Sequence, residues 1–217
     1  MPRSTASFIS YDLRPAKQSE RRILIELLKL GGDAGLPLPS YRYVGMGANR
    51  FYDFLLIHKY VGLTNMITLE HDPDMHKRAL YNLPFYFIDA RYQTVADFLA
   101  SDTAQEPTIY WFDYDGGVGG HIVQNINDLA LNAKPGDFGF VTVFGGPPRR
   151  LSQMNSAARL AWLQDNLGAV AGGVTLSDVT NSNFPDAVHK VLMAAFTNAF
   201  ASRRDGTFYP FLQVEYT

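Results

Sequence analysis

Residues 41–54, YRYVGMGANRFYDF, join a short strand-like run to two closely spaced glycines and then to aromatic residues at helical spacing. A strand, a glycine turn and a helix in this order are typical of the first unit of a nucleotide-binding α/β fold. The dinucleotide fingerprint would place a third glycine at position 50, where this chain has Arg50. The stretch therefore predicts an α/β fold and argues against a dinucleotide enzyme.

The segments that follow alternate in the same way. Strand-like runs occur at residues 65–72 (NMITLEHD), 85–90 (FYFIDA), 108–117 (TIYWFDYDGG) and 136–146 (GDFGFVTVFGG), with helical patterns between them. Strands rich in β-branched and aromatic residues, separated by helices, indicate βαβ units. We therefore expect a Rossmann-like fold, in which helices cover both faces of a mostly parallel sheet.

An amino-terminal helix precedes this pattern. Residues 14–32, RPAKQSERRILIELLKLGG, begin with a proline suited to a first helical turn and end at two glycines. We expect its leucines and isoleucines to pack inward, and Arg14, Lys17, Glu20 and Arg21 to stay on the polar face. Residues 1–40 are expected to form an extension packed on a domain of residues 41–217, which gives one domain overall.

The last eleven residues, TFYPFLQVEYT, predict a sixth strand over residues 209–216. The chain stops at the point where a further, antiparallel strand would have to begin. An uncovered strand edge leaves backbone groups unsatisfied. We therefore expect a second copy of the chain, or another subunit of a complex, to cover this edge.

Composition limits the classes of function. The 217 residues carry 19 basic and 21 acidic side chains, so no broad positive field favours a nucleic-acid polymer. The chain has no cysteine, which excludes disulfides and thiolate chemistry. Neither a signal-peptide pattern nor a membrane-spanning apolar run is present, so a cytoplasmic protein without membrane contact is expected.

Acidic residues follow three successive strand-like runs. Glu70, with His71 after it, ends the second run at a spacing suited to binding a ribose diol. Asp89 ends the third, where a carboxylate can accept a hydrogen bond from an exocyclic amine, and Asp113 and Asp115 end the fourth. Each acid alone is more simply explained as a helix cap or a solvated loop residue. Together with the glycine turn they favour a nucleoside ligand without a pyrophosphate, such as S-adenosylmethionine.

These motifs resemble a known family. The runs YRYVGMG, FYDFLLIHKYVG and ITLEHD, together with YWFDYDGG, are similar to class I S-adenosylmethionine-dependent methyltransferases, and more narrowly to a bacterial O-methyltransferase group. The similarity covers most of the chain and is strongest over residues 10–145. It implies that the cofactor is bound by the following residues: Gly45, Met46, Gly47, Glu70, His71, Asp89 and Ala90. It also implies that Asp113, Tyr114 and Asp115 lie near the transferred methyl group.

The expected reaction is O-methylation of an acceptor that the sequence does not identify. Asp113 or Asp115 would remove the acceptor's proton or orient the acceptor. The paired aspartates also permit a divalent metal, although we expect none. Arg149 and Arg150, after the fifth strand, and Lys17 on the first helix would bind an anionic acceptor group. Two other functions stay open, namely a catalytically inactive S-adenosylmethionine-binding subunit of a complex and a nucleic-acid methyltransferase.

Overall fold

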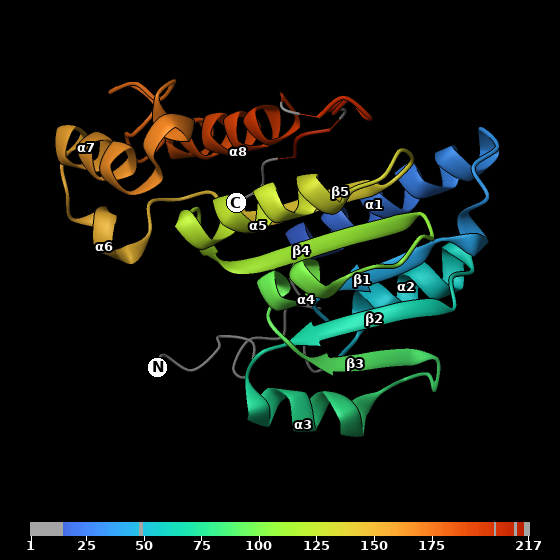
Figure 1. Cartoon of the computed structure of the whole chain (residues 1–217). Helices are drawn as coiled ribbons and strands as arrows, with labels where there is room; N and C mark the ends of the chain where they lie inside the picture. Colours follow the sequence, from blue (N-terminus) through green and yellow to red (C-terminus); the bar gives the residue numbers. More distant parts are fainter. Residues whose placement is uncertain (1–14, 48–49, 202, 211, 215–217) are drawn as a thin grey trace. The chain divides into compact units, whose positions relative to one another are not determined.

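The computed structural model describes residues 15–47, 50–201, 203–210 and 212–214, in which strands and helices alternate (Figure 1). The elements are α1 (Pro15–Asp33), η3 (Leu38–Ser40), β1 (Arg42–Gly45), α2 (Tyr52–Val61), β2 (Asn65–Glu70), α3 (Pro73–Asn82), β3 (Ile88–Tyr92), α4 (Val95–Ser101), β4 (Thr108–Gly117), α5 (Gly120–Asn132), β5 (Phe138–Phe144), α6 (Arg149–Ser152), α7 (Ser156–Leu167), η4 (Gly168–Ala171) and α8 (Phe184–Ala201). None of the described helices is both long and apolar enough to cross a membrane.

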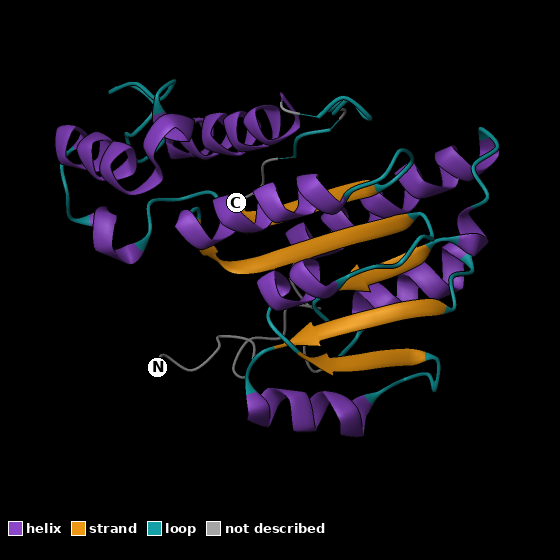
Figure 2. Ribbon diagram, viewed as in Figure 1, coloured by secondary structure: helices purple, strands orange, loops and turns teal. Residues whose placement is uncertain are grey.

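The strands form one five-stranded parallel sheet in the order β3-β2-β1-β4-β5 (Figure 2). The chain moves outward from β1 through β2 to β3 and then returns across both to β4. Right-handed crossovers therefore place α2 and α3 on one face of the sheet and α4 on the other. Figure 1 shows α4 in front of the strands and α2 behind them. The predicted α/β fold is confirmed, and the strand order reverses between β1 and β4.

The chain divides into two compact units. Among the described residues, the first contains those within 15–113 and 136–141, and the second contains those within 114–135 and 142–214. The first unit thus holds β1 to β3 with α1 to α4, and the second holds α5 to α8. The division into an extension and a main domain stays a prediction.

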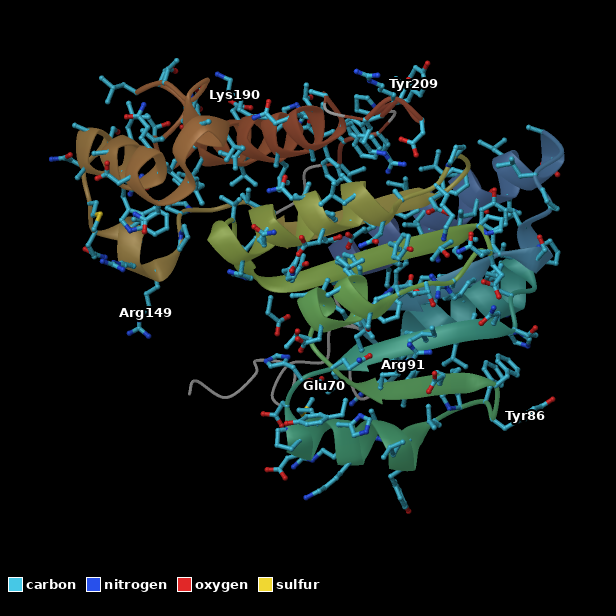
Figure 3. The ribbon with its side chains drawn as sticks, viewed as in Figure 1. Glu70, Tyr86, Arg91, Arg149, Lys190 and Tyr209 are labelled. Atoms are coloured by element: carbon cyan, nitrogen blue, oxygen red, sulfur yellow. The ribbon has the colours of Figure 1, made fainter. Side chains whose placement is uncertain are left out.

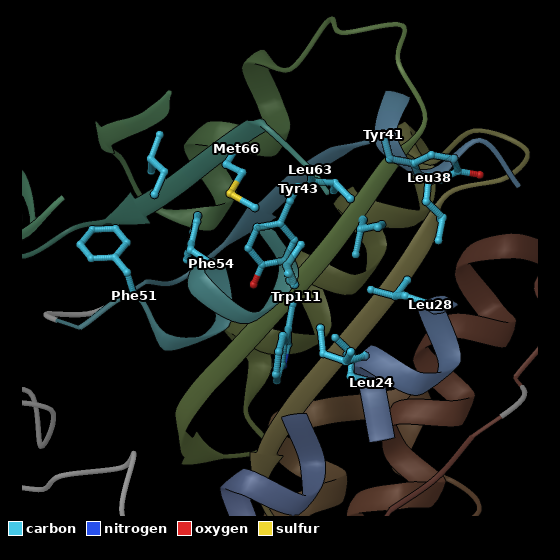
Figure 4. Packing of buried hydrophobic residues seen from close by; sticks show 14 of the residues in the cluster. Leu24, Leu28, Leu38, Tyr41, Tyr43, Phe51, Phe54, Leu63, Met66 and Trp111 are labelled. Carbon is cyan, nitrogen blue, oxygen red and sulfur yellow. The ribbon is translucent and has the colours of Figure 1, made fainter. Parts of the chain in front are cut away.

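The core of the first unit is built from both sides of β1. Leu24 and Leu28 of α1, Tyr43 of β1, Phe54 of α2 and Met66 of β2 belong to one buried cluster (Figure 4). The rings of Tyr43 and Phe54 meet edge to face, with centroids 4.8 Å apart. This packing explains why α1, which precedes the sheet in sequence, is fixed against it.

Helix α1 corrects one prediction. Lys17 and Arg21 are buried, and they lie on the same helical face as Leu24, Ile25 and Leu28. The spacing of four residues between the two cations continues the apolar stripe toward the amino end of the helix. Their expected place on the polar face is therefore wrong, and Arg14 lies outside the described residues. A buried cation needs a partner, and both find one at the candidate site.

The second unit is helical and is held by two arginines. Arg159 of α7 is buried and donates hydrogen bonds to the backbone oxygens of Leu151, Ser152 and Val179. Arg203 donates to the backbone oxygens of Ala130 and Ala133 at the end of α5. Because the last carbonyls of a helix have no partner within it, this guanidinium caps α5.

The carboxyl end corrects a second prediction. Within the described part of residues 209–216, namely 209–210 and 212–214, no residue is in a strand. Phe208 instead stacks on Phe196 of α8, with ring centroids 4.9 Å apart. Pro210 follows and has no amide hydrogen to give to a sheet. The expected sixth strand is therefore wrong for these residues, while a partner at this end stays a prediction.

Candidate functional site

Ligands of open α/β sheets bind outside the carboxyl ends of the strands, where the strand order reverses. In this sheet that point lies between β1 and β4. Gly45, the last residue of β1, is opposite Trp111 of β4. Strand β4 continues beyond Trp111, so Asp113 lies two residues past the level at which β1 ends. The candidate site is the group of side chains at this edge in the first unit.

The two glycines of the first turn are required by packing inside the protein. A Cβ atom at Gly45 would lie 2.5 Å from the Tyr43 hydroxyl oxygen. One at Gly47 would lie 2.8 Å from both the Phe51 ring and Thr68 Oγ1. The Gly47 amide donates a hydrogen bond to Thr68 Oγ1 at 2.9 Å. The turn is thus closed by its own contacts, whereas the sequence led us to expect glycines that admit a ligand. Met46, between them, is partly buried.

Glu70 ends β2 as predicted, with its side chain mostly buried (Figure 3). Its Oε1 accepts a hydrogen bond from the Asp72 amide at 2.8 Å. Within the described residues, no donor contacts Oε2. Asp72 is the N-cap of α3 and accepts from the amides of Asp74 and Met75. His71 is exposed, and its Nδ1 lies 3.5 Å from Glu70 Oε1. One carboxylate oxygen of Glu70 is therefore held by the Asp72 amide, and the other has no donor among the described residues.

Asp89 does not end β3. The strand runs Ile88–Tyr92, and Asp89 is its second residue, opposite Ile67. Its carboxylate is exposed and accepts a hydrogen bond from Arg91 at 2.7 Å. Ala90 lies next in the strand, opposite Thr68. The predicted position of these two residues at the carboxyl edge of the sheet is therefore wrong.

Gln93 occupies the place that we expected for Asp89. Its amide donates to the backbone oxygen of Glu70 at 3.1 Å, so the two residues lie at adjacent strand ends. Its Oε1 is buried without a hydrogen-bond partner among the described residues. A buried unpaired acceptor is costly and often marks a ligand site. The capping box of Thr94 and Asp97 fixes the start of α4, and that motif in the sequence could have moved the end of β3 beyond Asp89.

Charged residues from three elements meet beside β1. Lys17 Nζ of α1 lies 2.7 Å from Asp113 Oδ1 of β4 and 2.8 Å from Glu20 Oε2. One turn further along α1, Arg21 Nε donates to Asp53 Oδ1 in the first turn of α2 at 2.5 Å. The two buried cations of α1 thus hold one carboxylate on β4 and one on α2.

Burial controls the ionisation of this cluster. It raises the pKa of Asp113 to about 6, although the Lys17 ammonium opposes the shift. It also raises the pKa of Asp53 against the opposing effect of Arg21. Burial lowers the pKa of Lys17, but the carboxylates of Asp113 and Glu20 outweigh it, so the net shift is upward. Lys17 is therefore charged at neutral pH, and Asp113 can gain or lose a proton close to that range.

A comparison with family models assigns the chain to a family. The family described as "Putative O-methyltransferase" matches residues 9–217. The chain belongs to this methyltransferase family. A search of curated proteins found no match.

The other residues predicted for the methyltransferase reaction lie in the second unit. The Tyr114 hydroxyl oxygen accepts a hydrogen bond from Asn125 Nδ2 at 2.8 Å. Burial raises the pKa of Tyr114 to about 12, so its hydroxyl keeps its proton at neutral pH. Asp115 is exposed and lies within β4. Arg149 and Arg150 are exposed at the start of the short helix α6, where Figure 3 labels Arg149.

The paired aspartates of β4, Asp113 and Asp115, are residue types that can bind a divalent metal. In the part of the chain that the structure describes, no three His, Asp or Glu side chains are grouped as a metal ion would require. Lys17 was expected to bind the acceptor from an exposed position. It is instead buried and held by Asp113 and Glu20, so its position suits control of Asp113.

Proposed function

We propose that this protein transfers a methyl group from S-adenosylmethionine to a hydroxyl oxygen of its acceptor. Membership of the methyltransferase family supports the transfer of a methyl group. The observation that carries the cofactor assignment is Glu70, whose Oε2 has no donor within the described residues at the carboxyl edge of the sheet. A carboxylate in this position fits a ribose, whose two hydroxyls can both donate to it.

Gln93 supports the same assignment. Its unpaired Oε1 fits the exocyclic amine of adenine, which is a donor. The hydrogen bond between the Gln93 amide and the Glu70 carbonyl places the two side chains at neighbouring strand ends, as the joined base and ribose of one nucleoside require. In this proposal Gln93 takes the adenine-side role that the sequence suggested for Asp89. Met46 and His71 border the same edge.

Asp113 is the proposed proton acceptor. When bound, S-adenosylmethionine supplies a methyl group activated by a sulfonium. The acceptor oxygen forms the new C–O bond, the electron pair of the broken C–S bond stays on sulfur, and the hydroxyl proton passes to the Asp113 carboxylate. With a pKa of about 6 this carboxylate is mostly ionised at pH 7, and it is more basic than an exposed aspartate.

Lys17 orients Asp113 through the 2.7 Å contact. Tyr114 follows Asp113 in β4 and keeps its hydroxyl proton, so it can donate a hydrogen bond to the acceptor. Asp115 and the exposed Arg149 and Arg150, all in the second unit, stay predicted acceptor-binding residues. Two exposed arginines favour an acceptor that carries a carboxylate or phosphate.

Isothermal titration with S-adenosylmethionine tests the cofactor. Wild-type protein should bind it, and Glu70→Gln should bind about 10- to 100-fold more weakly, because a neutral amide accepts hydroxyl hydrogen bonds less strongly than a carboxylate. Glu106→Gln is the matched control, since Glu106 is exposed and precedes β4, at the amino ends of the strands and away from their carboxyl edge. Failure of the wild-type protein to bind S-adenosylmethionine would refute the proposal.

Formation of S-adenosylhomocysteine with a library of hydroxyl compounds tests the reaction. Acceptors that carry a carboxylate or phosphate should be methylated in preference to neutral ones. Asp113→Asn should lower the rate constant about 100-fold or more, because the amide cannot take the proton. An unchanged rate constant in this variant would remove Asp113 from the mechanism.

A further inference from the structure

Five charged side chains form what we call the α1 charge network: Lys17, Glu20, Arg21, Asp53 and Asp113. Three contacts of 2.8 Å or less join them, from Lys17 to Glu20 and Asp113, and from Arg21 to Asp53. When all are ionised, these described members carry two positive and three negative charges. The neutral, buried phenol of Tyr43 also faces the network and adds no charge.

The shortage of positive charge is concentrated at Asp113. Asp53 has Arg21 as a close partner, whereas Asp113 shares the single ammonium of Lys17 with Glu20. The Asp113 side chain is also the most open member, 28% exposed, whereas the others are 9–13% exposed. It stands past the end of β1, at the point where the sheet places its ligand. A cation that enters the site will therefore meet the least neutralised carboxylate of the network.

We propose that the α1 charge network binds the positively charged cofactor in preference to its neutral product, through exchange of a proton on Asp113 for the charge of the sulfonium. The inference rests on the proposed use of S-adenosylmethionine. The cofactor and S-adenosylhomocysteine have the same base, ribose and amino-acid groups, and they differ by one methyl group and one positive charge at sulfur. The network therefore distinguishes the cofactor, which must bind, from the product, which must dissociate, by the positive charge at sulfur.

The physical reason is charge compensation under low solvation. Asp113 is partly buried, and its ammonium partner also contacts a second carboxylate. The free energy of such a carboxylate falls when it binds either a proton or a nearby cation. The two compete, so the sulfonium displaces the proton. The product brings no charge and leaves the proton in place. Binding of the cofactor should thus be linked to proton release, while binding of the product should not be.

The linkage predicts how selectivity depends on pH. At pH 5 Asp113 is mostly protonated before either ligand binds, so the cofactor must first displace that proton. At pH 8 the carboxylate is already ionised and attracts the sulfonium directly. The ratio of the product Kd to the cofactor Kd should therefore rise about 10-fold or more from pH 5 to pH 8.

Calorimetry measures the proton directly. The wild-type protein is titrated at pH 6 with S-adenosylmethionine and with S-adenosylhomocysteine, each in two buffers whose enthalpies of ionisation differ. About half a proton should be released with the first ligand and close to none with the second. Asp113→Asn should abolish the difference between the ligands. Lys17→Met, which removes the shared ammonium, should shift the proton release to higher pH, and Lys29→Met, on the exposed side of α1, should leave it unchanged.

The outcomes separate the two proposals. If the wild-type protein binds neither ligand, the proposed cofactor itself is wrong. If it binds both with the same proton release and the same pH dependence, the cofactor assignment stands and the charge-exchange inference is overturned. The pH dependence of the wild-type Kd ratio needs no variant, so the test does not depend on whether Asp113→Asn or Lys17→Met folds.

Discussion

Two buried charge networks lie at opposite ends of the same parallel strands. At the amino end, Arg42 begins β1, contacts Thr108 at the start of β4 and pairs with Asp102. At the carboxyl end, Asp113 of β4 pairs with Lys17. Both pairs join a cation to an aspartate within one unit, but only the second lies where ligands of this fold bind.

The amino-end network is complete. The Arg42 guanidinium makes two hydrogen bonds to Asp102, of 2.8 and 2.5 Å, and two more to Thr108 Oγ1, of 3.2 and 3.1 Å. Burial opposes ionisation of Asp102, but the hydrogen bonds and charge of Arg42 outweigh it and lower the pKa of Asp102. The pKa of Asp113 moves the other way, to about 6. Among the described carboxylates, the Arg42 guanidinium pairs with Asp102 alone, so this contact stabilises the fold. Lys17 contacts both Glu20 and Asp113, which leaves Asp113 able to exchange a proton.

The largest expected effect is at the amino end. Arg42→Met leaves the Asp102 carboxylate buried without its partner and should lower the free energy of unfolding by about 3–5 kcal/mol. Urea denaturation measures the loss. Arg91→Met is the control, because Arg91 forms an exposed pair with Asp89, and its loss should cost less than about 1 kcal/mol. Equal losses in the two variants would contradict the view that the amino-end network is a stabilising element.

Two buried threonines allow a matched comparison of the ends. Thr108 Oγ1 accepts from the charged Arg42, whereas Thr68 Oγ1 accepts from the Gly47 amide. Thr108→Val should lower the free energy of unfolding by about 1.5–3 kcal/mol and leave the affinity for S-adenosylmethionine unchanged. Thr68→Val should cost about 1 kcal/mol and weaken that affinity, because it releases the glycine turn. Chemical denaturation and calorimetry on both variants measure the two quantities, and the reverse pattern would break the distinction between the ends.

At the carboxyl end, we expect the free energy of unfolding to depend on pH through Asp113. Because the pKa of Asp113 is higher in the folded protein than in the unfolded chain, the folded state binds more protons between about pH 4 and pH 6. The stability contributed by the protonated group is therefore present below pH 4 and lost as the pH rises through 6. Asp113→Asn should be more stable than wild type at pH 8 by about 1–2 kcal/mol and should lose that advantage at pH 4. Thermal unfolding across this range measures it, and a constant difference would mean that Asp113 does not titrate as a buried acid.

The fold was predictable because its signals are local. β-branched and aromatic runs, glycine turns and helix starts lie close together in the sequence, and the alternation of strands and helices required a parallel sheet. The position of Glu70 at the end of β2 was also predicted correctly, because the apolar run that forms the strand ends at this residue. The strand predicted at the carboxyl end was wrong for its described residues, since the stacking of Phe208 on Phe196 is a tertiary contact.

The charge networks could not be predicted in the same way. Lys17 and Asp113 are 96 residues apart, and Arg21 and Asp53 are 32 apart. A lysine on an amphipathic helix has the same local pattern whether it faces water or a buried carboxylate. The sequence therefore identified Asp113 as a reactive candidate but placed Lys17 on the wrong face. Burial, which sets the ionisation of both, is a property of the assembled fold.

The smallest expected effect tests a residue that the sequence placed at the wrong end. Asp89 precedes the carboxyl edge of β3 by three residues, is exposed and pairs with Arg91. Asp89→Ala should change neither the free energy of unfolding by more than about 0.5 kcal/mol nor the affinity for S-adenosylmethionine. Gln93→Leu, at the edge itself, should weaken binding about 10-fold, because it removes the buried acceptor proposed for adenine. Calorimetry on the two variants decides between them: a loss of affinity in Asp89→Ala with none in Gln93→Leu would return the adenine-side role to the aspartate and would place the ligand away from the end of the strand.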